Sequence, residues 1–213
     1  MRTVLKSLLA AALGVAVLAV APEATAKRAA PPKLPEPGKA VPDTTPLEAT
    51  IEGTAKYTLD LGGKTAEEFE KGLKGEKVPP PPKVDLKLVV KNTSKETIQL
   101  WTSGDPVTVE LKLTGKGAVQ AKPMLMTTAD FRLPKAVEVE AGKTVEFPIK
   151  GLAGGFRNID HYWYWTQAGE YELVATLKSG VNPAPKGAAD GGDGFGQVMV
   201  ASKAFKITVD EKK

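Results

Sequence analysis

The chain has 213 residues, a formal net charge of +4 and no cysteine. The lack of cysteine excludes disulfide bonds, zinc–thiolate sites and a thiol nucleophile. Its 29 basic and 25 acidic residues are interspersed along the chain. Nucleic-acid binding would instead gather lysine and arginine on one element, so we expect no nucleic-acid partner.

The first 26 residues are typical of a secretory signal peptide. Arg2 and Lys6 precede the apolar run Ser7–Ala21, and Ala24–Ala26 supplies small residues for a peptidase. The run holds about 15 residues, fewer than the ~20 that a membrane-spanning helix needs. The sequence therefore predicts an exported protein, periplasmic or extracellular, with no stable membrane insertion after the signal is cleaved.

Residues 27–46 contain six prolines among alanine, lysine and threonine. A segment of this composition cannot bury enough apolar surface to order itself. We predict an extended, proline-rich tether over 27–46, followed by one folded domain over 47–210.

The folded region begins with a strand pattern and one helix pattern. Apolar residues recur at every second position from Leu47 to Leu59, with a bulge expected at Gly53. The segment Lys64–Lys74 predicts a short surface helix, because Phe69 and Leu73 are four residues apart and acidic residues lie in its first turn. The prolines at 79–82 end that helix.

The rest of the chain alternates apolar and polar residues in short runs. The turn Asn92-Thr93-Ser94, which also matches a glycosylation sequon, predicts a hairpin between 84–90 and 98–100. The turn Ala141–Lys143 predicts a second strand pair, and 119–133 gives no clear element. Further strands are expected at 107–113, 171–177, 198–200 and 205–209. About eight strands and one short inserted helix predict an all-β, immunoglobulin-like antiparallel β-sandwich.

Two aromatic residues refine this prediction. Tyr171 follows a glycine turn at the start of a late strand, where immunoglobulin-like sandwiches carry a "tyrosine corner" whose hydroxyl bonds back to the backbone. An ordinary strand tyrosine is the alternative. Trp101 is predicted to be the central core tryptophan.

The strand–turn pattern resembles that of a known family. Leu86–Leu113, with Asn92-Thr93-Ser94 and Ser103-Gly104-Asp105 between its strands, is similar to bacterial BsuPI-like proteinase-inhibitor domains, and Val137–Ile149 continues the similarity. It also resembles exported bacterial sandwich proteins. The resemblance covers half of the mature chain and implies an immunoglobulin-like fold. The helix insertion and the long loop before the last strands depart from a compact inhibitor domain, so no reactive-site residue is carried over.

The densest candidate site is the run His161-Tyr162-Trp163-Tyr164-Trp165. In an extended strand Tyr162 and Tyr164 face one side, while Trp163 and Trp165 face the other. Both faces cannot enter the same core layer. We therefore predict that one pair is exposed and contacts a protein or a glycan. A hydrophobic plug at one end of the sandwich is the alternative.

Catalytic and metal chemistry find little support. His161 is the chain's only histidine, whereas zinc and copper sites need several nitrogen or sulfur ligands. We expect no enzyme, metal or cofactor. The loop Ser179–Gly196 contains Asp190 and Asp193, but these lack the spacing of a known calcium loop, and a flexible solvated loop is the favoured interpretation.

These observations predict an exported, non-catalytic β-sandwich that acts by protein or glycan contact at the cell envelope. Two alternatives remain at this stage. A secreted proteinase inhibitor would present Ser179–Gly196 to its target. A carbohydrate-binding module would use Tyr162–Trp165.

Overall fold

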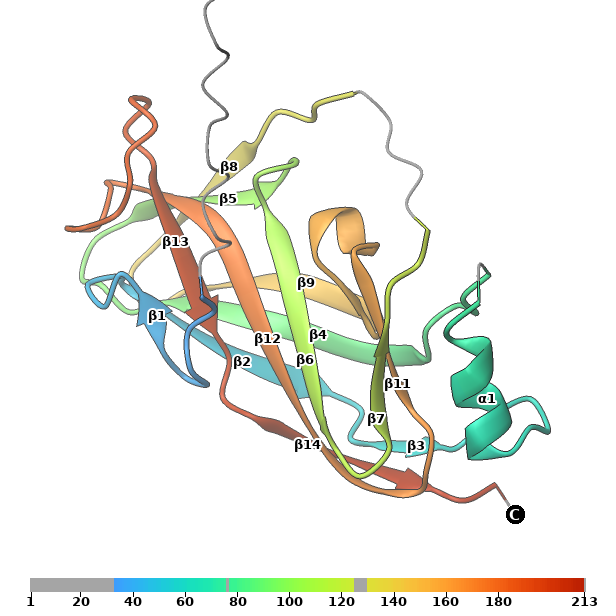
Figure 1. Cartoon of the computed structure of the whole chain (residues 1–213). Helices are drawn as coiled ribbons and strands as arrows, with labels where there is room; N and C mark the ends of the chain where they lie inside the picture. The colour runs from blue at the N-terminus through green and yellow to red at the C-terminus, as the bar shows by residue number, and fades with distance from the viewer. Residues whose placement is uncertain (1–32, 76, 125–129, 213) are drawn as a thin grey trace, which may run out of the picture. The chain divides into compact units, whose positions relative to one another are not determined.

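The computed structural model describes residues 33–75, 77–124 and 130–212 (Figure 1). Within them the chain forms an all-β sandwich with one α-helix, and the strand pairs are antiparallel except for one parallel pair. No helix among these residues is both long and apolar enough to cross a membrane. The leader predicted over 1–26 lies outside the described residues.

The larger sheet is organised around one long strand, β12 (Gly169–Asn182). One edge of β12 pairs with β13 (Gly196–Ala201) and β14 (Phe205–Asp210), and the other pairs with β6 (Thr108–Gly115) and β5 (Ile98–Ser103). The outer strands are β1 (Ala40–Val41), β3 (Lys56–Thr58) and β8 (Lys135–Val139). β12 has partners on both edges along most of its length, and from Leu173 to Asn182 all of its residues are buried or half-buried.

Two smaller sheets complete the strands. The first has the order β2 (Leu47–Gly53), β4 (Lys83–Asn92) and β9 (Thr144–Gly151), and it packs on the larger sheet. Their facing side chains, among them Leu88, Leu100 and Leu173, form one core cluster. The second has the order β10 (Ala153–Gly154), β11 (His161–Trp165) and β7 (Ala118–Ala121).

The predicted hairpins are wrong, although the strands themselves are present. β4 and β5 lie in different sheets, and so do β8 and β9. A turn signal marks where the chain reverses, but it does not tell a hairpin from a connection that crosses between two layers.

A buried asparagine holds these two connections together. The Asn92 side chain is fully buried, and its amide nitrogen donates to the carbonyls of Glu96 and Val139, at 2.8 Å each. Its amide oxygen accepts from the backbone nitrogen and the hydroxyl of Ser94, at 2.9 and 2.7 Å. With all four bonding positions occupied inside the protein, Asn92 is a structural residue rather than a glycosylation acceptor.

The tyrosine corner is confirmed, but the core tryptophan is not Trp101. The Tyr171 hydroxyl donates to the carbonyl of Gln167 at 2.7 Å. Trp101 is half-buried and stacks on Phe195, with ring centroids 4.9 Å apart. Trp165 occupies the core instead.

The helix is confirmed as α1 (Ala66–Gly72), beginning from the N-cap Thr65. Thr65 and Glu68 form a capping box, in which each side chain accepts from the other residue's backbone nitrogen. The backbone hydrogen bond from Thr65 lowers the pKa of Glu68.

The second half of the predicted tether belongs to the fold. β1 pairs with β13, and the Gly38 backbone nitrogen donates to the carbonyl of Ser202. Thr45 is buried. Backbone pairing to an existing sheet orders this segment without a large apolar side chain, which is why composition alone placed the start of the domain too late. Residues 27–32 lie outside the described part.

Candidate functional site

The aromatic strand β11 alternates as predicted, but its two faces enter two different cores. Trp163 and Trp165 pack with the main core, where Trp165 stacks on Tyr57 with centroids 5.3 Å apart. Tyr162 and Tyr164 pack in a second cluster beneath α1, where Tyr164 meets the edge of Phe69 at 5.6 Å. The helix provides the second layer that the sequence prediction did not foresee.

This burial limits which aromatic residues can contact a partner. Tyr164 and Trp165 are 1% and 5% exposed, so neither offers a ring face to a protein or glycan, contrary to the role predicted for them. The Tyr164 hydroxyl donates to the carbonyl of Pro79, and burial raises its pKa. Tyr162 and Trp163 are half-buried, and a contact role for those two stays a prediction.

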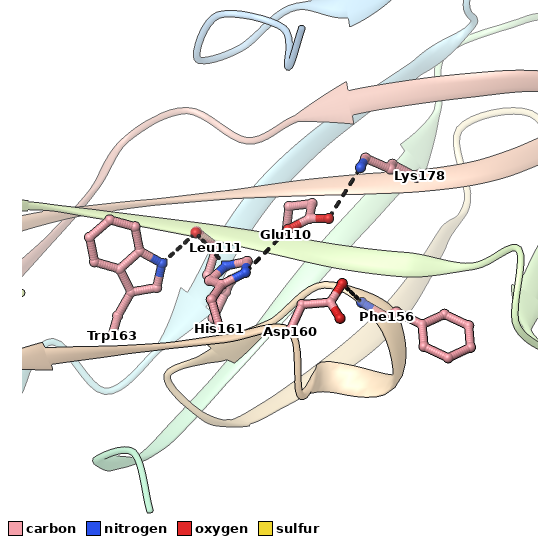
Figure 2. A network of polar contacts seen from close by, with 7 residues as sticks. All are labelled: Glu110, Leu111, Phe156, Asp160, His161, Trp163 and Lys178. Atoms are coloured by element: carbon pink, nitrogen blue, oxygen red, sulfur yellow. Dashed lines mark hydrogen bonds and ion pairs between the residues drawn. The ribbon is translucent and has the colours of Figure 1, made fainter. Parts of the chain in front are cut away.

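The side chains of His161 and Trp163 attach the small third sheet to the edge of β6. The Trp163 indole nitrogen donates to the carbonyl of Leu111 at 2.6 Å, and His161 Nε2 lies 3.2 Å from the same oxygen (Figure 2). The Gly155 backbone nitrogen donates to the next outward carbonyl of this edge, that of Val109. The side chains of His161 and Trp163 thus bond a carbonyl of β6 that a neighbouring strand would otherwise pair with. The His-x-Trp spacing therefore has a structural role.

A short charged network lies beside this attachment. Glu110 accepts from the Lys178 ammonium at 3.1 Å, and its other oxygen lies 3.7 Å from His161 Nδ1 (Figure 2). The described residues contain no group of three or more His, Cys, Asp or Glu residues placed to hold a metal ion. Each charge in the network faces an opposite charge or a hydrogen-bonding ring, as in a structural cluster.

The glycines before the aromatic strand serve close packing rather than flexibility. A Cβ atom on Gly154 would lie 2.7 Å from the backbone nitrogen of Leu111, and one on Gly155 would lie 2.4 Å from the Asp160 Cβ. The Asp160 carboxylate accepts from the Phe156 backbone nitrogen at 2.7 Å. The turn is therefore a rigid support for β11.

A bidentate ion pair anchors the segment that precedes β8. Arg157 Nε and Nη2 donate to the two oxygens of Asp105, at 3.0 and 2.9 Å, and the two side chains are 14% and 6% exposed. Asp105 also accepts from the Arg132 backbone nitrogen, and Arg157 donates to the Asp130 carbonyl. The Arg157 guanidinium lowers the pKa of Asp105. This clamp fixes residues 130–132 against the turn between β5 and β6.

Four large apolar side chains on or near the clamped segment are exposed, which the sequence did not reveal. Met124, Phe131 and Leu133 are 74%, 66% and 76% exposed, and Val137 on β8 is also exposed. We call these four residues the apolar edge. These residues lie in or next to the segment 119–133, whose sequence has no clear periodicity and so did not predict whether they are buried. The structure shows that no described residue covers them.

A pocket of about 580 Å³ lies where α1, the proline segment 79–82 and the ends of β3 and β11 meet. We call it the end pocket. Its walls include the edges of Tyr164 and Trp165 together with the more exposed rings of Tyr57 and Phe69. The predicted contact strand β11 thus contributes Tyr164 and Trp165 to the wall of a cavity, although both residues are almost fully buried.

The loop 183–195 shows no arrangement for calcium. Asp190 accepts from the Gly192 backbone nitrogen at 2.7 Å and Asp193 from that of Phe195 at 3.0 Å, so both carboxylates support local turns. Phe195 anchors the end of the loop on Trp101. The role of this loop in an inhibitor stays a prediction.

Comparison with known proteins finds no matching family model, no similar curated protein and no similar solved structure. The resemblance to BsuPI-like domains therefore remains a prediction from the sequence.

The structural role assigned to Trp163 predicts a specific stability loss. Trp163→Phe removes the indole donor to Leu111 and should lower the free energy of unfolding by about 1–2 kcal/mol more than Trp101→Phe does. Trp101 is the matched control, because it is also half-buried and its indole nitrogen makes no hydrogen bond among the described residues. Urea unfolding measures both, and equal losses would contradict the role.

The clamp predicts an acid-sensitive component of stability. Because the pKa of Asp105 is lowered in the folded state, its contribution is present above the ordinary carboxylate pKa and is lost as pH falls through the lowered value. Asp105→Asn should therefore narrow the difference between urea midpoints measured at about pH 7 and about pH 3. Asp85→Asn, which removes an exposed carboxylate, is the control. An unchanged difference for Asp105→Asn would contradict the clamp.

Proposed function

We propose that the chain is an exported, non-catalytic binding module that contacts a protein at the cell envelope through the apolar edge. The observation that carries this proposal is the concentration of exposed apolar side chains. Of the six large hydrophobic residues exposed among the described residues, four lie in the stretch 124–137. Isolated exposed hydrophobic residues are ordinary, but Phe131, Leu133 and Val137 are exposed close together in the chain, as is typical of an interaction site.

The clamp supports this role because it orders the surface before a partner arrives. Both backbone atoms of Arg132 that face Asp105 are bonded, since its nitrogen donates to the carboxylate and its carbonyl accepts from the Asp105 nitrogen at 2.9 Å. Phe131 and Leu133 flank this fixed residue. A preordered segment loses less conformational entropy on binding, which favours affinity.

The strand that follows adds a backbone surface. Among the described strands β8 pairs with β5 alone, so its other edge is open to a strand of a partner. Lys135 and Glu138 are exposed on it. Charged residues on an edge strand disfavour nonspecific pairing between copies, so a partner would need complementary charges.

A paired-variant experiment tests the proposal. Phe131→Ser combined with Leu133→Ser should reduce crosslinking of the dominant partner in the native envelope fraction by about tenfold, because exposed aromatic and aliphatic anchors carry most binding energy. Leu34→Ser combined with Val41→Ser removes two exposed hydrophobic residues elsewhere and should leave the crosslink intact.

Circular dichroism of both variants verifies that the fold is retained, since all four positions are exposed. Equal crosslinking by the two double variants would overturn the proposal.

A further inference from the structure

The end pocket has the size and lining of a ligand site and shares no residue with the apolar edge. Its volume of about 580 Å³ falls within the range of roughly 300–1,000 Å³ usual for small-molecule sites. Tyr57 and Phe69 are half-buried and show part of their rings to the cavity, while Pro79, Pro80 and Pro82 form an apolar wall. Walls of this kind suit a ring-shaped group.

The rim of the pocket is biased toward positive charge. Lys83 lines it and is exposed, and its side chain makes no hydrogen bond or ion pair with any described residue. The one carboxylate in the lining, Asp60, accepts from the Gly62 backbone nitrogen at 3.0 Å and lies 3.9 Å from the Lys212 ammonium. Its charge is therefore offset locally, whereas that of Lys83 faces solvent and the cavity.

Lys64 adds a second ammonium to the lining. Glu68 interacts electrostatically with Lys64, and its carboxylate also accepts from the Thr65 backbone nitrogen at 2.9 Å. The electrostatic balance of the cavity therefore favours an anion over a cation.

We propose that the end pocket binds a ring-bearing organic anion, with the ring against Tyr57, Phe69 and the proline wall and the carboxylate directed to Lys83. Two sources share this chemistry. One is an acidic sugar unit of an envelope polysaccharide, and the other is a free aromatic carboxylate. The ring supplies apolar contact with the walls, and the carboxylate supplies a charge-assisted hydrogen bond to the ammonium.

Calorimetric titration of the purified exported protein tests this site. The probes are galacturonic acid and benzoate, each compared with a neutral ring of the same kind, galactose or benzyl alcohol. We expect saturable binding of at least one anion and binding of its neutral partner that is about tenfold weaker or absent. The anion that binds identifies the source. Trp165, in the pocket wall, provides a fluorescence signal for the same titration.

A lysine variant assigns the binding to the pocket. Lys83→Gln should weaken binding of the anion about tenfold. Lys91→Gln, which removes an exposed charge on the same strand, should not change it. The Lys83 side chain makes no hydrogen bond or ion pair with a described residue, and the substitution leaves the backbone pairing of β4 with β9 in place, so the variant should unfold at the wild-type urea concentration.

Three results would overturn the proposal: no saturable binding of either anion, equal affinity for the neutral rings, or equal effects of the two lysine variants. None of these depends on Phe131 or Leu133. If the end pocket does not bind an anion, the proposed protein contact through the apolar edge still stands. If the apolar edge does not bind a protein, the proposed anion site in the end pocket still stands.

Discussion

The position of the two facing sheets depends on the buried side chain of Asn92. It ties the end of β4 to the carbonyl of Val139 at the end of β8, while its backbone exchanges hydrogen bonds with Gly142 and Lys143. The β4–β5 connection and the β8–β9 connection, both of which cross between the sheets, therefore meet at one residue. An unpaired buried amide would cost free energy, so the complete set of partners favours this one arrangement of the layers over alternatives that leave the amide unsatisfied.

The positions of the two proposed contact regions depend on this arrangement of the sheets. β6, held by β12, exposes one edge, to which Trp163 and His161 attach the third sheet. That attachment places Trp165 in the main core and Tyr164 in the second cluster, and the end pocket lies beside both. The turn that leads into β11 carries Arg157, and the pairing of Arg157 with Asp105 fixes the segment 130–132 next to Leu133. Both proposed contact regions thus depend on the support of one strand.

Much of the fold was predictable because its signals are local. Period-two alternation located the strands, the four-residue spacing of Phe69 and Leu73 with acidic residues in the first turn marked the helix, and the glycine turn before Tyr171 indicated the corner. Strand partners were not predictable, since a turn such as 92–94 suits a hairpin and a crossing equally well. The candidate site was the part of the structure that was hardest to predict from the sequence. The aromatic run suggested binding because α1 as a covering layer was not foreseen, and Phe131 and Leu133 lie where no period is visible.

The absence of cysteine allows the crossing arrangement to be tested directly with introduced pairs. Lys91 faces Thr144 on β9, and Gln99 faces Glu138 on β8. Oxidation of Lys91→Cys with Thr144→Cys, and of Gln99→Cys with Glu138→Cys, should form a disulfide in each folded double variant, as mass spectrometry would show. Lys91→Cys with Gln99→Cys should remain reduced. Rapid disulfide formation in that last variant, with none in the first two, would contradict the two-layer account.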